Sequence, residues 1–274
     1  MSDEQKTRPF LKWAGGKRRL LEQYAPYFPV LKKKATYFEP FLGGGAIFFR
    51  LLPAKAQLSD INEELINTYI ALRDETEQLR ALIRAHARNH NEEYYYYMRD
   101  YSPKSDLRRA ARFIYLNRTC YNGLYRVNSK GKFNVPMGRY KAPFKNIDEW
   151  LVDAAIALQH AKIEVSSFEA VTKAAKSGDL VYFDPPYQPI SDTAYFTSYS
   201  KDSFREEDQR RLAEVFAELT KKKVFVMLSN SDHPLIRELY AKSAKRIVDV
   251  KAGRAINSKA SKRGAITELL VLNY

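Results

Sequence analysis

The sequence predicts an α/β fold, in which a mostly parallel sheet is interrupted by a helical insertion that carries a β-hairpin. Two observations support this prediction. Short apolar runs at 37–42 and 178–183 end at glycine or acidic residues, as buried parallel strands do. Between these runs, apolar residues recur at helical spacing from 62 to about 120, which indicates a helical segment placed between strands of one sheet.

The composition favours a nucleic-acid partner. The net charge is +14 and the isoelectric point about 9.6, an excess that points to a polyanion. The chain has 19 tyrosines and 15 phenylalanines, which offer rings for stacking extruded or single-stranded bases. The single cysteine, Cys120, and four histidines without ligand spacing exclude a disulfide framework and predict no metal site. Without a signal peptide or a bilayer-spanning apolar run, we expect a soluble cytoplasmic protein.

The segment 9–17 contains a Gly-Gly-Lys sequence that does not match a phosphate-binding loop. Leu11 stands where that motif needs glycine, and Arg18 stands where it needs a Mg²⁺-binding serine or threonine,. What remains is the aromatic ring of Trp13, two glycines that allow close backbone approach, and Lys17. This set suits an organic ligand with an adenine and a carboxylate better than a triphosphate.

The strand at 37–42 runs into the glycine triplet 43–45 and then into an apolar helix. A glycine-rich turn from strand to helix is the usual nucleotide-binding corner of a Rossmann-like sheet. Phe48 occupies the third small position of the dinucleotide fingerprint, which disfavours a pyrophosphate. A second strand, at 56–59, ends at Asp60, where ribose hydroxyls are commonly bound. Adenosine without a pyrophosphate narrows the ligand to S-adenosylmethionine or a similar molecule.

Residues 119–141 predict a β-hairpin that binds DNA. Asn-Gly and Lys-Gly turns separate short β-prone runs,, and the segment is both basic and aromatic. A ribbon of this kind fits a major groove, with Arg126 bidentate to guanine and with Arg139 and Lys141 on phosphates.

The rest of the sheet is expected after the insertion. Its helices and strands lie, in order, at 147–160, 162–165, 178–183, 206–220, 224–228, 246–251 and 266–272. The last two strands form an antiparallel edge. The strand at 162–165 leads to Phe168, which we expect to be a wall for the adenine. The long loop 188–203 is expected to be a lid or to contact nucleic acid.

The tetrapeptide Asp184-Pro185-Pro186-Tyr187 follows one of the predicted buried strands directly. Two prolines cannot continue a ladder, so the chain leaves the sheet there. Asp184 is thereby placed at the carboxyl end of a strand, where open α/β sheets bind their ligands. A carboxylate, the rigid carbonyl of Pro185 and the flat ring of Tyr187 together suit a planar amine.

Six blocks of the sequence resemble the Dam-type DNA adenine methyltransferases, in the order that this family has them. The blocks are 10–17, 38–45, 59–62, 121–126, 184–187 and 228–231. The resemblance spans nearly the whole chain, and several blocks in register are more specific than any single motif. It implies a Rossmann-like S-adenosylmethionine-dependent methyltransferase sheet at 1–62 and 145–274, with an inserted helical DNA-recognition domain at 63–144.

The resemblance and the patterns above define three sets of candidate site residues. The catalytic set is Asp184, Pro185 and Tyr187. The S-adenosylmethionine set is Trp13, Lys17, Phe38, Gly43, Gly45, Asp60, Phe168 and Asp184. The DNA set is Lys12, Tyr121, Asn122, Leu124, Arg126, Pro136, Arg139 and Lys141.

The reaction that the resemblance implies is methyl transfer to the amino group of an adenine flipped out of double-stranded DNA, with GATC as the usual target. Cytosine carbon-5 methylation is excluded, because Cys120 lies in the predicted hairpin and not after a proline in a catalytic loop. Amino-group methylation of cytosine or of RNA, and a non-catalytic DNA-binding regulator, remain alternatives. We expect a monomer without an obligate protein partner, associated with the nucleoid and serving restriction–modification or DNA replication and repair.

Overall fold

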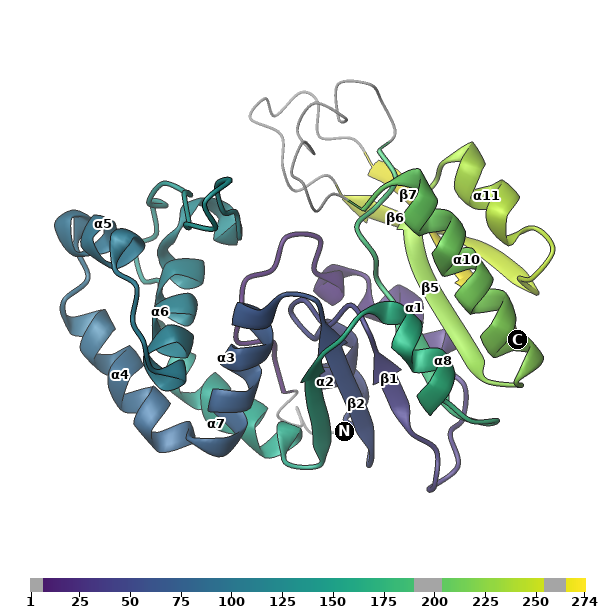
Figure 1. Cartoon of the computed structure of the whole chain (residues 1–274), viewed down its shortest axis with the longest axis horizontal. Helices are drawn as coiled ribbons and strands as arrows, with labels where there is room; N and C mark the ends of the chain where they lie inside the picture. The colour runs from purple at the N-terminus through teal and green to yellow at the C-terminus, as the bar shows by residue number, and fades with distance from the viewer. Residues whose placement is uncertain (1–6, 190–203, 254–264) are drawn as a thin grey trace. The chain divides into compact units, whose positions relative to one another are not determined.

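The computed structural model of the chain describes residues 7–189, 204–253 and 265–274 (Figure 1). The protein is a mixed α/β protein with a seven-stranded sheet, as predicted. It divides into two compact units. The first comprises Met1–Arg18, Leu42–Pro53 and Asp60–Val165, and the second comprises Arg19–Phe41, Ala54–Ser59 and Ser166–Tyr274. The predicted catalytic and recognition domains are a functional division with other boundaries, and they stay a prediction.

Most of the sheet belongs to the second unit. Its strands are β1 (Tyr37–Glu39), β2 (Ala56–Asp60), β4 (Leu180–Phe183), β5 (Phe225–Ser231), β6 (Arg246–Gly253) and β7 (Ala265–Leu272). They follow the order β2-β1-β4-β5-β7-β6. Strands β2, β1, β4 and β5 are parallel, whereas β7 is antiparallel to both β5 and β6. The closing pair is therefore the antiparallel edge that the sequence predicts.

The apolar runs of the second unit form its buried core. All four residues of β4 are buried, as a strand covered on both faces requires. The helix α10 (Glu206–Lys221) adds Leu212, Phe216 and Leu219 to the same core, and Figure 1 shows α10 and α11 (Pro234–Tyr240) beside β5 and β7. The short helices of this unit are α1 (Leu21–Tyr24), η2 (Ala25–Tyr27), η4 (Phe168–Ala170) and α8 (Val171–Ala174).

The first unit is mainly helical, as the periodicity between 62 and 120 predicts. Its helices are α2 (Ala46–Leu51), α3 (Glu63–Asp74), α4 (Thr76–Arg88), α5 (Glu92–Asp100), α6 (Asp106–Thr119) and α7 (Ile147–Leu158), and the strand β3 (Ala161–Val165) closes it. The helix α6 is central, because it is buried along most of its length and packs against α3, α4 and α5.

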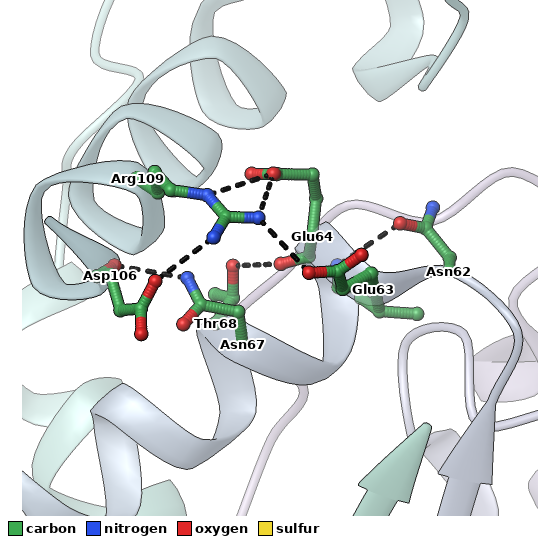
Figure 2. A network of polar contacts seen from close by, with 8 residues as sticks. Asn62, Glu63, Glu64, Asn67, Thr68, Asp106 and Arg109 are labelled. Carbon is green, nitrogen blue, oxygen red and sulfur yellow. Dashed lines mark hydrogen bonds and ion pairs between the residues drawn. The ribbon is translucent and has the colours of Figure 1, made fainter. Parts of the chain in front are cut away.

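An ion-pair network joins α3 to α6 (Figure 2). The Arg109 guanidinium donates to the Glu64 carboxylate and the Asp106 carboxylate, at 2.9 Å in each case. The Asn67 side chain donates to the Asp106 carbonyl at 2.9 Å. Asn62 caps α3 by accepting from a backbone amide of its first turn at 3.1 Å. The network fixes α3, the helix that follows Asp60, against α6, the helix that leads into the predicted hairpin.

The predicted hairpin at 119–141 has a less regular structure than the sequence suggests. Its two sides are antiparallel, but the described residues pair only as isolated bridges, Cys120 with Met137 and Val127 with Phe133. Asn122 (φ 55°) and Gly123 (φ 63°) adopt left-handed conformations inside a short 3₁₀ turn, η3 (Tyr121–Gly123). Two successive left-handed residues coil the chain where a ladder would begin, so the segment is a loop with antiparallel bridges.

The predicted loop 188–203 lies almost wholly outside the described residues. Among the helices that the structure describes, none combines the length and the apolar character needed to cross a bilayer.

Candidate active site

The tetrapeptide Asp184-Pro185-Pro186-Tyr187 begins directly after β4. This strand lies between β1 and β5, and both neighbours run parallel to it. Asp184 therefore stands at the carboxyl end of a central parallel strand, the position that the sequence predicts and that ligands of open α/β sheets occupy. The two prolines carry no amide hydrogen, so the ladder ends there.

The Asp184 carboxylate is held from the neighbouring strand. Ser229, a fully buried residue of β5, donates its hydroxyl to Asp184 Oδ1 at 2.9 Å. The Tyr182 hydroxyl lies 2.9 Å from the same serine oxygen. A carboxylate held by a buried donor keeps one orientation, which a group that must accept a hydrogen bond from a substrate requires.

The Tyr187 side chain is anchored at its hydroxyl end. The hydroxyl donates to Oε2 of Glu268, a β7 residue, at 2.7 Å. Burial and the nearby negative charge of Asp184 raise the pKa of Tyr187 well above its usual range, so the phenol keeps the proton that it donates.

The backbone of the same turn is fixed by three side chains. Gln209 donates to the Pro186 carbonyl at 3.0 Å. Asn230 accepts from the Gln188 amide at 3.3 Å, and Ser231 donates to the Gln188 carbonyl at 2.7 Å. Because all three side chains are buried, the backbone is held at the residue before Tyr187 and at the residue after it.

The predicted aromatic wall is mostly part of the core. Phe38 and Phe168 are 4% and 6% exposed and belong to one hydrophobic cluster of the second unit. Phe168 stacks on Phe41, with ring centroids 5.4 Å apart and an interplanar angle of 23°. Phe41 is half-buried, so it is a better candidate for direct ligand contact than Phe38 or Phe168, and the sequence reasoning missed it.

The glycine-rich corner of the first unit is built around Trp13. A Cβ atom at Gly43 would lie 2.8 Å from the Trp13 indole, and a Cβ at Gly44 would lie 3.0 Å from the Trp13 side chain. Gly43 (φ +46°) and Gly45 (φ +65°) also adopt left-handed conformations, which glycine favours. The indole thus rests on the glycine turn, and only residues without a side chain allow this contact.

Asp60 closes the same corner. Its carboxylate accepts from the Gly43 amide at 3.1 Å and from the Asn62 amide at 3.0 Å. Burial raises the pKa of Asp60, although these backbone hydrogen bonds act in the opposite direction. The next residue, Ile61, is 67% exposed and offers an apolar surface beside the carboxylate, which the sequence reasoning did not identify.

Lys17, the remaining predicted cofactor residue of the first unit, is 4% exposed. Its ammonium donates to the Gly15 carbonyl at 2.7 Å. Within the first unit, the structure therefore supplies a carboxylate, an ammonium, an indole and an exposed aliphatic side chain. This donor set fits an adenosine that carries an amino acid, because a carboxylate can accept from ribose hydroxyls, an ammonium can pair with a carboxylate, and the apolar groups can cover a ring.

The predicted DNA residues lie in the first unit. Along 119–141, six of them are exposed and Leu124 is half-buried; the exposed ones are Tyr121, Asn122, Arg126, Pro136, Arg139 and Lys141. The Arg126 side chain donates to Asn134 Oδ1 at 2.8 Å, so part of its fork is engaged within the loop.

Lys12 is the predicted DNA residue in the most constrained setting. Its ammonium lies 3.3 Å from the centre of the Tyr140 ring and donates to the Arg118 carbonyl at 3.1 Å. Burial, followed by the positive charge of Arg118, lowers the pKa of Lys12 to about 8. The lysine is thus a cation whose proton is held less tightly than that of a solvated lysine.

Comparison with known proteins finds one matching family model and several related proteins. Residues 13–256 match the model of the D12 class of N6 adenine-specific DNA methyltransferases. The chain is 48% identical to the type II methyltransferase M1.LlaDCHI of Lactococcus lactis subsp. cremoris, over 97% of this chain and 95% of the relative.

Two further relatives are more distant. The type II methyltransferase M.MjaIII of Methanocaldococcus jannaschii is 41% identical, with 97% of this chain and 99% of the relative covered. The DNA adenine methylase of Escherichia coli strain K12 is 39% identical, with 97% and 95% covered. The chain therefore belongs to the D12 class of N6 adenine-specific DNA methyltransferases.

Proposed function

We propose that this adenine-specific DNA methyltransferase acts on the adenine of GATC in double-stranded DNA and flips the adenine out of the duplex before methyl transfer. The observation that carries the proposal is the pair of groups at the end of β4: an Asp184 carboxylate held by Ser229 at 2.9 Å, and the Tyr187 ring on the same turn. A base inside a duplex presents neither its face nor both amino hydrogens to such a pair, so it must leave the stack.

The chemistry requires a more nucleophilic amine. The lone pair of the adenine amino nitrogen is delocalised into the ring. We infer that the Asp184 carboxylate and the Pro185 carbonyl accept its two N–H hydrogens, while the Tyr187 ring stacks on the base. This favours a pyramidal nitrogen. As the N–C bond forms and the donor's S–C bond to the methyl group breaks, Asp184 would stabilise the positive charge on nitrogen, which is lost when one amino proton leaves to solvent.

The methyl donor is proposed to be S-adenosylmethionine, which supplies a methyl group on a sulfonium and allows a single in-line displacement. Asp60 would accept from the ribose hydroxyls, Lys17 would pair with the carboxylate, and Trp13 and Ile61 would cover apolar parts of the ligand. Gly43 and Gly45 keep the backbone close to it. Phe41 would take the place of the predicted Phe38 and Phe168, whose rings are buried in the core. Asp184 also belongs to the predicted set.

The DNA contacts are proposed from exposure and charge. Arg126 would read guanine, and Arg139 and Lys141 would bind phosphates. Lys12, Tyr121, Asn122, Leu124 and Pro136 would complete the contact surface. Support for GATC comes from the resemblance of residues 121–126 to the Dam-type block. An enzyme of this kind would act as a monomer on nucleoid DNA in the cytoplasm.

The test is methyl transfer from labelled S-adenosylmethionine to three short duplexes. One carries GATC, one carries GTAC, and one carries GATC already methylated at both adenine amino groups. The expected result is label in the unmodified GATC duplex only, recovered as 6-methyladenine. Label in both unmodified duplexes would overturn the GATC assignment and keep the reaction. Label recovered as methylcytosine would overturn adenine as the substrate.

A further inference from the structure

Glu268 lies far from the tetrapeptide in sequence but beside it in the sheet. It is in β7, whose antiparallel register pairs Glu268 with Ser231 of β5. Residues 229–231 of β5 are the ones that hold Asp184 and the turn after it. The register therefore brings the Glu268 carboxylate to the Tyr187 hydroxyl, 2.7 Å away and 81 residues earlier in the chain.

The pKa of a second tyrosine, Tyr24, is affected by the carboxylates of both Asp184 and Glu268. The buried Tyr24 has its pKa raised by burial, then by the charge of Asp184 and then by the charge of Glu268. Tyr24 therefore lies within electrostatic reach of both groups. A half-buried glutamate is costly to desolvate, and the hydrogen bond from Tyr187 offsets part of this cost. Such a pair at a ligand-bearing strand end suggests a role beyond packing.

We propose that Glu268 is a positioning residue of the active site: it holds the Tyr187 ring by the hydroxyl, so that a base stacked on the ring presents its amino group to Asp184. The inference rests on the proposed function. A tyrosine fixed only by its backbone can still rotate about two side-chain bonds. A hydrogen bond to a carboxylate removes that freedom at the far end of the ring, and such bonds are shorter and stronger than neutral ones.

Four variants test the pair: Glu268→Ala, Glu268→Gln, Tyr187→Phe and the double variant Tyr187→Phe/Glu268→Ala. The matched control is Asp249→Ala, which removes an exposed carboxylate from the neighbouring strand β6 that pairs with Arg237. Two quantities are measured: the single-turnover rate of methyl transfer to a GATC duplex, and the fluorescence of 2-aminopurine at the target position, which reports extrusion and stacking.

Glu268→Ala and Tyr187→Phe are each expected to slow transfer about 10- to 100-fold, because a small misplacement of a reacting group costs that much. Both should leave 2-aminopurine brighter than in the wild-type complex, since the extruded base stacks less well. The double variant should be no slower than the slower single variant. Glu268→Gln should stay within a few-fold of wild type, because its amide oxygen still accepts from the hydroxyl.

Glu268→Ala with wild-type transfer would overturn the inference. So would a double variant whose loss is the product of the two single losses, because the two residues would then act independently. If Glu268→Ala does not fold, Tyr187→Phe and Glu268→Gln probe the same hydrogen bond from its two ends. Failure of the proposed function looks different: the wild-type protein itself would then transfer no methyl group to adenine in the GATC duplex.

Discussion

The Asn117 carboxamide binds both backbone polar groups of Lys12. Its Oδ1 accepts from the Lys12 amide at 2.8 Å, and its Nδ2 donates to the Lys12 carbonyl at 2.6 Å and to the Gly123 carbonyl at 3.1 Å. Asn117 is 3% exposed. A Cβ atom at Gly123 would lie 2.5 Å from Lys12 Cβ, so the two backbone segments pack closely. One buried amide of α6 thereby joins the segment that carries Trp13 to the 119–141 loop.

Asn117→Ala should therefore weaken both folding and DNA recognition. It leaves one backbone amide and two carbonyls without this partner, and the free energy of unfolding should fall by about 2 kcal/mol or more. Urea unfolding and DNA titration measure the two effects. The control is Asn67→Ala, which removes one exposed hydrogen bond to the Asp106 carbonyl. Equal losses in the two variants would contradict the role given to Asn117.

Lys12 should make DNA binding depend on pH. Its pKa is lowered to about 8 in the free protein, and the proposed contact with a DNA phosphate requires the protonated form. Raising the pH through 8 removes the proton before binding, so affinity should be constant below this value and should fall above it. Fluorescence anisotropy of a labelled GATC duplex between pH 7 and 9.5 measures the effect. Lys12→Met should remove this pH dependence.

The control for Lys12 is Arg139→Gln. Arginine keeps its charge throughout this pH range, so this variant should lower the affinity by the same factor at every pH. A wild-type protein whose affinity does not change between pH 7 and 9.5 would show that the Lys12 ammonium makes no contact with DNA.

His86 should make the protein less stable in acid. Its Nδ1 lies 2.7 Å from the Tyr94 hydroxyl, and burial lowers the pKa of His86 from 6.5 to about 4. Between these values the unfolded chain takes up a proton that the folded chain does not, so the free energy of unfolding falls as the pH falls from about 6.5 to 4. Denaturant titrations at several pH values give the free energy of unfolding as a function of pH, and the slope of this plot should be shallower for His86→Gln. The exposed His160, changed to Gln, is the control and should leave the slope as it is.

The sequence was informative where the structural signal is local. The strand before Asp184 is a buried apolar run, and two prolines follow Asp184 directly. Both signals lie in consecutive residues of the sequence. The same holds for the glycine triplet 43–45, which needs left-handed backbone at Gly43 and Gly45. In the 119–141 loop, the Asn-Gly signal marked a turn correctly. It did not reveal that Asn122 and Gly123 both turn left-handed and prevent a regular ladder.

The tertiary parts of the site could not be predicted in this way. Glu268 reaches Tyr187 only through the antiparallel register of β7 on β5, and no local pattern contains that register. Asn117 is one polar residue in a helix, and its role depends on a segment 105 residues away. The sequence places Phe168 at the ligand because it follows a strand, and the family resemblance adds Phe38. Their burial shows that adjacency in sequence does not determine which ring is accessible.

Gly43→Ala should weaken S-adenosylmethionine binding. The new methyl group would lie 2.8 Å from the Trp13 indole, so the ring must move away from the turn. We expect a loss of about tenfold in affinity, since overpacking costs about 1–3 kcal/mol. Calorimetry with the cofactor measures it. The control is Gly178→Ala, at another glycine with positive φ (+89°) but with nothing within 4 Å of its Cβ. This variant should lower stability without changing cofactor affinity.

Asp184→Asn and Ser229→Ala should distinguish the contribution of the Asp184 charge to the transfer rate from that of the Ser229 hydrogen bond. Asp184→Asn keeps the size of the side chain but removes the charge, and single-turnover transfer should fall at least about 10²-fold, as when one preorganised electrostatic group is lost. Ser229→Ala leaves the charge but removes the donor 2.9 Å from Oδ1, so its loss should be smaller, about tenfold. Neither residue belongs to the proposed DNA surface, so the affinity for a GATC duplex should stay close to that of wild type in both. Near-normal transfer by Asp184→Asn would remove Asp184 from the mechanism, whereas a Ser229→Ala loss as large as that of Asp184→Asn would show that the hydroxyl takes part in the reaction directly.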